Sequence, residues 1–142
     1  MNFDEIPWSI AEGTHEGMPV ITRFRNFDSS FSRSRYPQRL NIFWKFSNPT
    51  DNGLPSPEDS ARAETFEDRL VEAVETDNQS ILSIVLTGKG RREYVFHTSN
   101  TKEFLQRLTA MPQEEERYPI EIDSSEDVDW EYVDSVLEGI KS

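Results

Sequence analysis

The chain contains no cysteine, only two histidines and no long apolar run, and each of these shortages excludes a class of protein. Without cysteine there are no disulfides, thiolate zinc sites, iron–sulfur clusters or cysteine nucleophiles. No stretch reaches the roughly 18 to 20 apolar residues that span a bilayer. The acidic start MNFDEIPWS also lacks the basic and apolar segments of a secretory signal. We therefore expect a soluble, cytoplasmic protein.

Basic residues are also scarce, because 15 Lys and Arg stand against 27 Asp and Glu, giving a formal charge of −12. A molecule this acidic repels phosphate backbones and anionic lipid, so we expect neither a nucleic-acid partner nor a membrane partner. At 142 residues the chain has the length of one domain and can bury roughly two thirds of its extended surface on folding. We expect a single domain over residues 1–142 that folds without a metal or a disulfide.

The hydrophobic spacing alternates between periods of two and 3.6, which predicts an α+β fold. The predicted parts are an N-terminal hairpin over 1–25, a basic loop over 26–39, a core over 40–123 and an acidic C-terminal helix over 127–141. In the hairpin, strands at 8–12 and 18–24 flank a glycine-bounded loop at 13–17. In the last helix, Asp127 or Asp129 is the cap, and one face carries Trp130, Val133, Leu137 and Ile140.

The core is predicted to run strand, helix, strand, strand, helix, strand. The strands cover 40–46, 81–87, 92–97 and 118–123, and the helices cover 57–75 and 101–111. Ser56 and Asn100 are the predicted N-caps, because each precedes an amphipathic run and offers a side-chain oxygen. This is the order of a ferredoxin-like βαββαβ core, an antiparallel sheet with both helices on one face. The second face then needs cover from the hairpin, from the last helix or from a partner.

Four segments carry a resemblance to a known family: GMPVITRFR, NGLPSPEDSARAETFEDRLVEAVE, ILSIVLTGKGRREYVFH and DVDWEYVDSVL. The most specific parts are LTGKGRRE at 86–93 and the DxDWEY pattern at 127–132. In this order they resemble the bacterial family catalogued only as domain of unknown function 695. That family is similar to a small acidic protein inhibitor of an RNA-degrading endonuclease with a ferredoxin-like fold. By analogy, the resemblance implies a non-catalytic, inhibitory role.

Charge is unevenly placed along the chain. Residues 112–142 hold 11 Asp and Glu against two bases, a net charge of −9, whereas residues 23–45 carry a net charge of +5. The two segments either pair across the fold, serve solubility, or leave an acidic surface with aromatic anchors for a basic partner. The candidate protein-binding residues are Glu114, Glu115, Glu116, Tyr118, Asp127, Asp129, Trp130, Glu131, Tyr132 and Asp134.

The turn between the two central predicted strands is the alternative candidate site. Gly88, Lys89, Gly90, Arg91 and Arg92 combine backbone donors with three cations, which suits a phosphate or carboxylate. The turn joins two strands and lacks the G-x-x-x-x-G-K-[ST] spacing, so it is not a nucleotide-binding loop. A plain hairpin turn, whose glycines allow positive φ and whose arginines pair with carboxylates, accounts for the same residues.

No metal motif or catalytic motif is evident. His15 and His97 lie far apart without a ligand at metal-site spacing, and the acidic run 123–131 lacks the glycine and closing glutamate of an EF-hand loop. No G-x-S-x-G elbow occurs, although the many serines leave a Ser, His and acid triad open. We therefore predict no metal, no cofactor and no catalytic residue.

The sequence thus supports two functions. The first is a non-catalytic binding module that inhibits or regulates a basic protein, such as a nucleic-acid enzyme or a toxin for which the chain is the immunity protein. The second is a small-molecule or anion-binding domain, with or without enzymatic activity, that uses the turn at 88–92. The oligomeric state and the open face of the sheet are not determined by the sequence.

Overall fold

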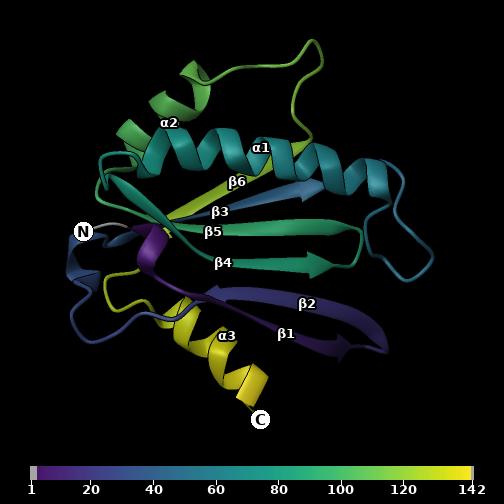
Figure 1. The fold of residues 1–142 in the computed structure, drawn as a ribbon, viewed down its shortest axis with the longest axis horizontal. Helices are drawn as coiled ribbons and strands as arrows, with labels where there is room; N and C mark the ends of the chain where they lie inside the picture. The colour runs from purple at the N-terminus through teal and green to yellow at the C-terminus, as the bar shows by residue number, and fades with distance from the viewer. Residues whose placement is uncertain (1–2, 142) are drawn as a thin grey trace.

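The computed structural model describes residues 3–141, so the predicted domain range of 1–142 begins and ends outside the described residues. Two elements are short 3₁₀ helices, η1 and η2, and the others are labelled in Figure 1. The elements are η1 (Phe3–Glu5), β1 (Trp8–His15), β2 (Met18–Arg25), η2 (Arg33–Arg35), β3 (Gln38–Lys45), α1 (Pro57–Glu75), β4 (Ser80–Gly88), β5 (Arg91–Thr98), α2 (Thr101–Ala110), β6 (Ile120–Glu126) and α3 (Glu131–Lys141). No helix among these residues is long and apolar enough to cross a membrane.

Within residues 3–141, six strands form one antiparallel sheet in the order β1-β2-β4-β5-β3-β6. The N-terminal hairpin extends this sheet, because β2 pairs with β4 and places Phe24 opposite Ile84. It therefore adds area to the sheet and does not cover a face. The last strand was predicted at an edge, and this is confirmed, since β6 pairs with β3 at the end of the sheet.

The two faces of the sheet carry separate cores. On one face, α1 and α2 pack on β3, β4 and β5 through residues that include Phe66, Phe104 and Trp44. On the other face, α3 and the N-terminal segment pack on Ile84 and Val95. Figure 1 shows α1 and α2 on one side of the strands and α3 on the other. Strand β4 is buried along almost its whole length, as its apolar run predicts.

Both predicted N-caps are confirmed. Ser56 accepts a hydrogen bond from the backbone N of Asp59 at 3.2 Å, and Asn100 accepts one from that of Glu103 at 3.0 Å. Each bond satisfies a backbone donor that the first helical turn leaves free. The side chain of Asp59 also turns back to the preceding loop and accepts a hydrogen bond from the backbone N of Ser47 at 3.0 Å. The start of α1 is thereby tied to the end of β3.

Several predicted boundaries are wrong. The first hairpin has a two-residue turn at Glu16 and Gly17, with φ of 54° and 81°, so its strands extend through the predicted loop at 13–17. Two consecutive positive φ angles match the twist of paired strands, which favours such a tight turn. The last helix begins at Glu131, because Trp130 has a φ of 57° and lies outside the helix. Strand β6 correspondingly extends beyond 118–123 to Glu126.

The loop between β3 and α1 touches the β4–β5 turn at Gly53. The backbone N of Gly90 donates to the carbonyl of Gly53 at 2.8 Å, and Gly53 has a φ of 83°. A Cβ at Gly53 would lie 2.9 Å from the backbone N of Lys89. Because the neighbouring atom belongs to the backbone, the clash cannot be relieved by rotating a side chain. Glycine at this position therefore allows the two turns to pack together.

Replacing Gly53 by alanine should lower the free energy of unfolding more than replacing Gly17 does. Both residues have positive φ, but a Cβ at Gly17 meets nothing within 4 Å, so Gly17→Ala is the matched control for backbone strain. Each change carries a left-handed penalty of about 1 to 2 kcal/mol, and the clash at Gly53 should add about 1 kcal/mol or more. Urea unfolding of the two variants measures the difference. Equal losses would contradict the close packing.

Candidate functional site

Trp130, the expected aromatic anchor of a protein-binding surface, is fully buried. Its indole Nε1 donates to the carbonyl oxygen of Tyr36 at 2.9 Å, and its ring stacks on the His97 imidazole with centroids 3.9 Å apart and planes 17° apart. Phe27 and Phe31 pack against its other edges. Trp130 is thus part of the second core and is not available to a partner in this conformation.

Asp127 is buried next to it and belongs to a polar network. Its Oδ2 lies 3.0 Å from His97 Nε2 and 3.2 Å from Arg39 Nη1, and its Oδ1 accepts from the backbone N of Glu131 at 3.0 Å. Burial alone would raise the pKa of Asp127, but hydrogen bonds from His97 and Arg39 outweigh it and lower that pKa. The carboxylate therefore stays ionised and caps α3 while holding the imidazole.

His97 has a defined tautomer in this network. The ionised Asp127 requires a proton on Nε2, so Nδ1 is unprotonated. The Ser83 hydroxyl lies 2.8 Å from Nδ1 and 2.9 Å from the carbonyl oxygen of Val95, and these two acceptors share its single proton. Burial lowers the pKa of His97 to about 4, against the opposing effect of the Asp127 carboxylate. The imidazole is therefore neutral at pH 7, and Trp130 stacks on an uncharged ring.

Ser83, His97 and Asp127 thus contain the residue types of a hydrolytic triad, which the sequence left open. Ser83 and His97 have no exposed surface, and neither residue lines any of the five best-formed pockets among the described residues. A nucleophile must reach its substrate, so this network has a structural role. Sequence reasoning missed it because the three residues are far apart in the chain and Ser83 lies in a β-bulge of β4.

The basic and acidic segments pair in part with each other. Arg33 lies 3.2 Å from Asp134, and Arg39 lies 3.2 Å from Asp127, so two acids of the C-terminal region are neutralised by the segment at 23–45. Glu114 lies between Arg62 and Arg69 of α1, at 3.4 and 3.8 Å. Tyr118 is partly buried against Trp44 and Phe66. Tyr132 is partly buried and donates to Glu93 at 2.5 Å.

The other acids of this region remain exposed and have no ion pair with any described residue. They are Glu115, Glu116, Glu121, Asp123, Glu126, Asp129, Glu131 and Glu138. Three of them, Glu121, Asp123 and Glu126, lie on β6, whose outer side pairs with no strand of the described chain. We call β6 with these three acids the acidic edge. Here exposed carboxylates adjoin free backbone donors and acceptors.

The turn at 88–92 is a tight hairpin that sends its cations to two faces. Lys89 and Gly90 have φ of 57° and 81°, as in a two-residue turn of type I′. Arg91 and Lys89 line a pocket beside α3, whereas Arg92 lines a hollow on the α1 face and donates to Thr87 at 3.0 Å. Successive strand residues point to opposite faces, so Lys89 and Arg91 come together and Arg92 does not join them.

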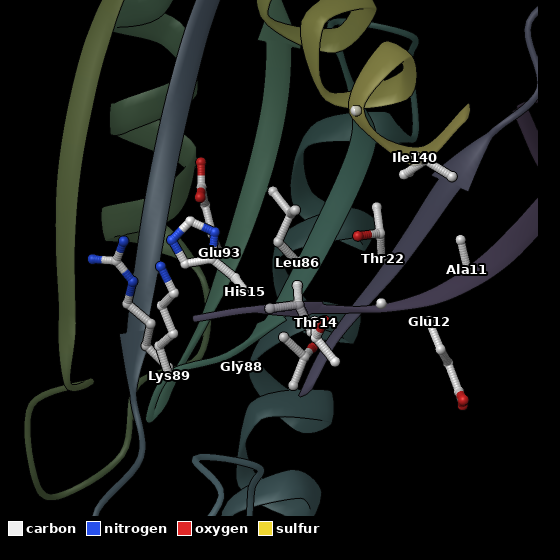
Figure 2. A pocket seen from close by; sticks show the side chains of 15 residues that line it. Ala11, Glu12, Thr14, His15, Thr22, Leu86, Gly88, Lys89, Glu93 and Ile140 are labelled. Carbon is white, nitrogen blue, oxygen red and sulfur yellow. The ribbon is translucent and has the colours of Figure 1, made fainter. Parts of the chain in front are cut away.

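The pocket beside α3 has a volume of about 490 Å³ and lies between the first hairpin, the centre of the sheet and the end of α3. We call it the α3 pocket (Figure 2). Its floor is a row of directly opposed residues, Ala11, Thr22, Leu86 and Glu93, from β1, β2, β4 and β5. Figure 2 shows Ile140 on α3 above Thr22, and Lys89 and His15 at the opposite end. Side chains from five elements therefore surround one space.

Glu93 is the most buried charged residue of this pocket, with 9% of its surface exposed. Its Oε2 accepts from Asn41 at 2.7 Å and from Tyr132 at 2.5 Å. Burial is the main cause that raises the pKa of Tyr132, and the Glu93 carboxylate is the second. The phenol therefore keeps its proton and donates the hydrogen bond to Glu93. Asn41 in turn accepts from Arg39 at 2.8 Å, which links the pocket to the His97 network.

No group of three or more histidine, aspartate and glutamate side chains among the described residues is placed to hold a metal ion. His15 lines the α3 pocket and is exposed, whereas His97 lies in the second core. The structure therefore puts the two histidines in separate environments.

Comparison with known proteins gives a family and no function. A family model described as "family of unknown function (DUF695)" matches residues 7–137, which is most of the chain. The chain belongs to the DUF695 family. No curated protein matches, and no solved structure matches. The DUF695 match includes both the acidic edge and the α3 pocket, apart from the last turn of α3.

The free energy of unfolding should fall as the pH is lowered from about 6.5 to 4. In the unfolded chain His97 takes up a proton near its ordinary pKa of about 6.5, whereas in the folded state it stays neutral down to about 4. The unfolded state binds more protons in this window, so stability rises with pH there, by about 3 kcal/mol in all. Urea unfolding at several pH values measures the slope.

His97→Gln should flatten this slope, because the amide can still bond Asp127 and Ser83 but does not titrate. His15→Gln is the matched control, since His15 is exposed, and it should leave the slope unchanged. An equal pH dependence in the wild type and in His97→Gln would show that the buried imidazole is not its source.

Proposed function

We propose that this protein is a non-catalytic binding module that captures a basic protein partner along the acidic edge. The single observation that supports this most is that Glu121, Asp123 and Glu126 are exposed and unpaired on a strand whose outer backbone groups are also free. Charge of this kind speeds the encounter with an oppositely charged protein. Free strand edges bind extended segments by continuing the sheet.

The chemistry of the edge favours one kind of partner segment. Residues of β6 alternate between the two faces of the sheet, with Glu121 and Asp123 on one face and Ile122, 36% exposed, on the other. A complementary strand would place Lys or Arg opposite Glu121 and Asp123 and an apolar residue opposite Ile122, whereas Glu126 lies on the same face as Ile122. Acids on an edge also oppose self-association, which is the simplest alternative explanation of the same residues.

We infer further that the part of the chain from β3 to β6 is a ferredoxin-like core. Its strand order, β4-β5-β3-β6, and the positions of α1 and α2 between strands support this inference. The resemblance to an acidic inhibitor of an RNA-degrading endonuclease then supports an inhibitory or immunity-type role for the edge. A basic nucleic-acid enzyme or toxin is the class of partner that this charge suits.

Neutralising the acidic edge should abolish salt-sensitive capture of the partner. The variant Glu121→Gln, Asp123→Asn, Glu126→Gln removes three charges at the edge. Each exposed ion pair contributes about 0.2 to 1 kcal/mol, so the loss of three pairs should lower the affinity by about threefold to 150-fold. The measurement is affinity capture from native lysate at low and high salt, with identification of the retained proteins and hydrogen exchange of the β6 amides in the complex.

The matched control is Glu64→Gln, Asp68→Asn, Glu72→Gln. It makes the same three chemical changes on α1, where these acids are exposed and have no ion pair with a described residue. A basic protein that the wild type and this control retain, but the edge variant loses, supports the proposal, as does protection of β6 in the complex. Equal retention by the edge variant, or no basic protein retained at low salt, overturns it.

A further inference from the structure

The α3 pocket exists because glycine stands where side chains would fill the sheet surface. Gly13 and Gly88 lie on its floor, and Gly139 lies above it on α3. A Cβ at Gly13 or Gly139 would meet no atom within 4 Å, whereas one at Gly88 would lie 2.8 Å from the carbonyl oxygen of Pro19. Gly88 is thus needed for strand packing. Gly13 and Gly139 have no such constraint, and they leave open space.

Two polar groups on the floor have bonding capacity directed into this space. Thr22 is 5% exposed, and its hydroxyl makes no hydrogen bond with any described residue. Glu93 accepts both of its hydrogen bonds at Oε2, and no described residue donates to Oε1. Neither Thr22 nor Glu93 has a fully enclosed unpaired atom, so each unpaired oxygen keeps surface that a ligand can reach. Buried polar groups are normally satisfied, which makes a donor from a ligand a fitting partner.

The lining carries charges of both signs, and these are separated in space. Lys89 and Arg91 form no ion pair with a described residue, and neither do Glu12 and Glu93. Arg91 and Glu93 lie on the same face of β5, two residues apart, which is about 7 Å along the strand. The guanidinium of Arg91 lies over the Phe43 ring at 4.5 Å. A ligand in this pocket would therefore meet a cationic end and an anionic end.

We propose that the α3 pocket binds a small amino-acid-like zwitterion with an apolar side chain. Its ammonium group would donate to Glu93, and its carboxylate would accept from Lys89 and Arg91. Its side chain would pack between Leu86 and Ile140. The volume of about 490 Å³ is in the usual range for small-molecule sites. The cationic end of this site adjoins the acidic edge, because Lys89, Arg91 and Glu121 line a neighbouring hollow, but no residue of the acidic edge lines the α3 pocket.

The probe is L-leucine, compared with two molecules that each lack one of its charges. These are 4-methylpentanoate, without the ammonium group, and 3-methylbutylamine, without the carboxylate. The measurement is a titration of the full chain followed by backbone amide NMR shifts. We expect leucine to shift the amides of residues 20–22 and 86–93, and to bind about tenfold or more tightly than either comparison molecule, because each lost charged hydrogen bond weakens binding.

Four variants test the roles of the residues. Arg91→Gln and Glu93→Gln should each weaken leucine binding about tenfold, and Glu93→Gln should leave 4-methylpentanoate binding unchanged. Gly13→Val should abolish binding by filling the pocket, with an unchanged urea midpoint, since valine suits a strand and meets open space. Arg92→Gln is the matched control, because Arg92 lies on the opposite face, and it should bind as the wild type does.

Three results would overturn the proposal. The first is the absence of leucine-dependent shifts at residues 20–22 and 86–93. The second is equally tight binding of leucine and 4-methylpentanoate, which would leave only an anion site at Lys89 and Arg91. The third is unchanged leucine binding by Gly13→Val, since a filled pocket cannot hold the probe.

Discussion

Strand β5 is buried on both faces, and a strand of this kind must be covered twice. Tyr94 and Phe96 face α1 and α2, whereas Val95 and His97 face the second core. The second cover has to accommodate a polar imidazole as well as apolar side chains. It does so with Trp130 on the ring and Asp127 at its edge, so the same few contacts bury β5 and attach the C-terminal segment.

This requirement explains which parts of the fold could be predicted from the sequence. Hydrophobic period, capping residues and turn glycines act locally, and they predicted the strands and the starts of α1 and α2 within a few residues. They also predicted that the second face needs a cover. They could not show that the first hairpin extends the sheet, because pairing of β2 with β4 depends on contacts between residues sixty or more positions apart.

The candidate residues were harder to predict, for a related reason. Trp130 and Asp127 lie in an acidic stretch whose composition is typical of exposed surface. Both residues are buried because they contact His97 on the sheet. Arg91 and Arg92 are a different case. The period of a strand already separates adjacent side chains onto two faces, so their division between two hollows could have been inferred from the predicted strand.

The C-terminal helix is attached unevenly. Its first turn is fixed by the Asp127 cap and the buried Trp130, whereas its last turn lies over the pocket, with Ile140 37% exposed. A helix held at one end frays first at the other, because the loose end has fewer buried contacts to lose. The mouth of the pocket can therefore widen while the second core stays closed. The rate at which a ligand enters or leaves through that mouth would then be set by the opening of a single helical turn. That opening costs far less free energy than global unfolding.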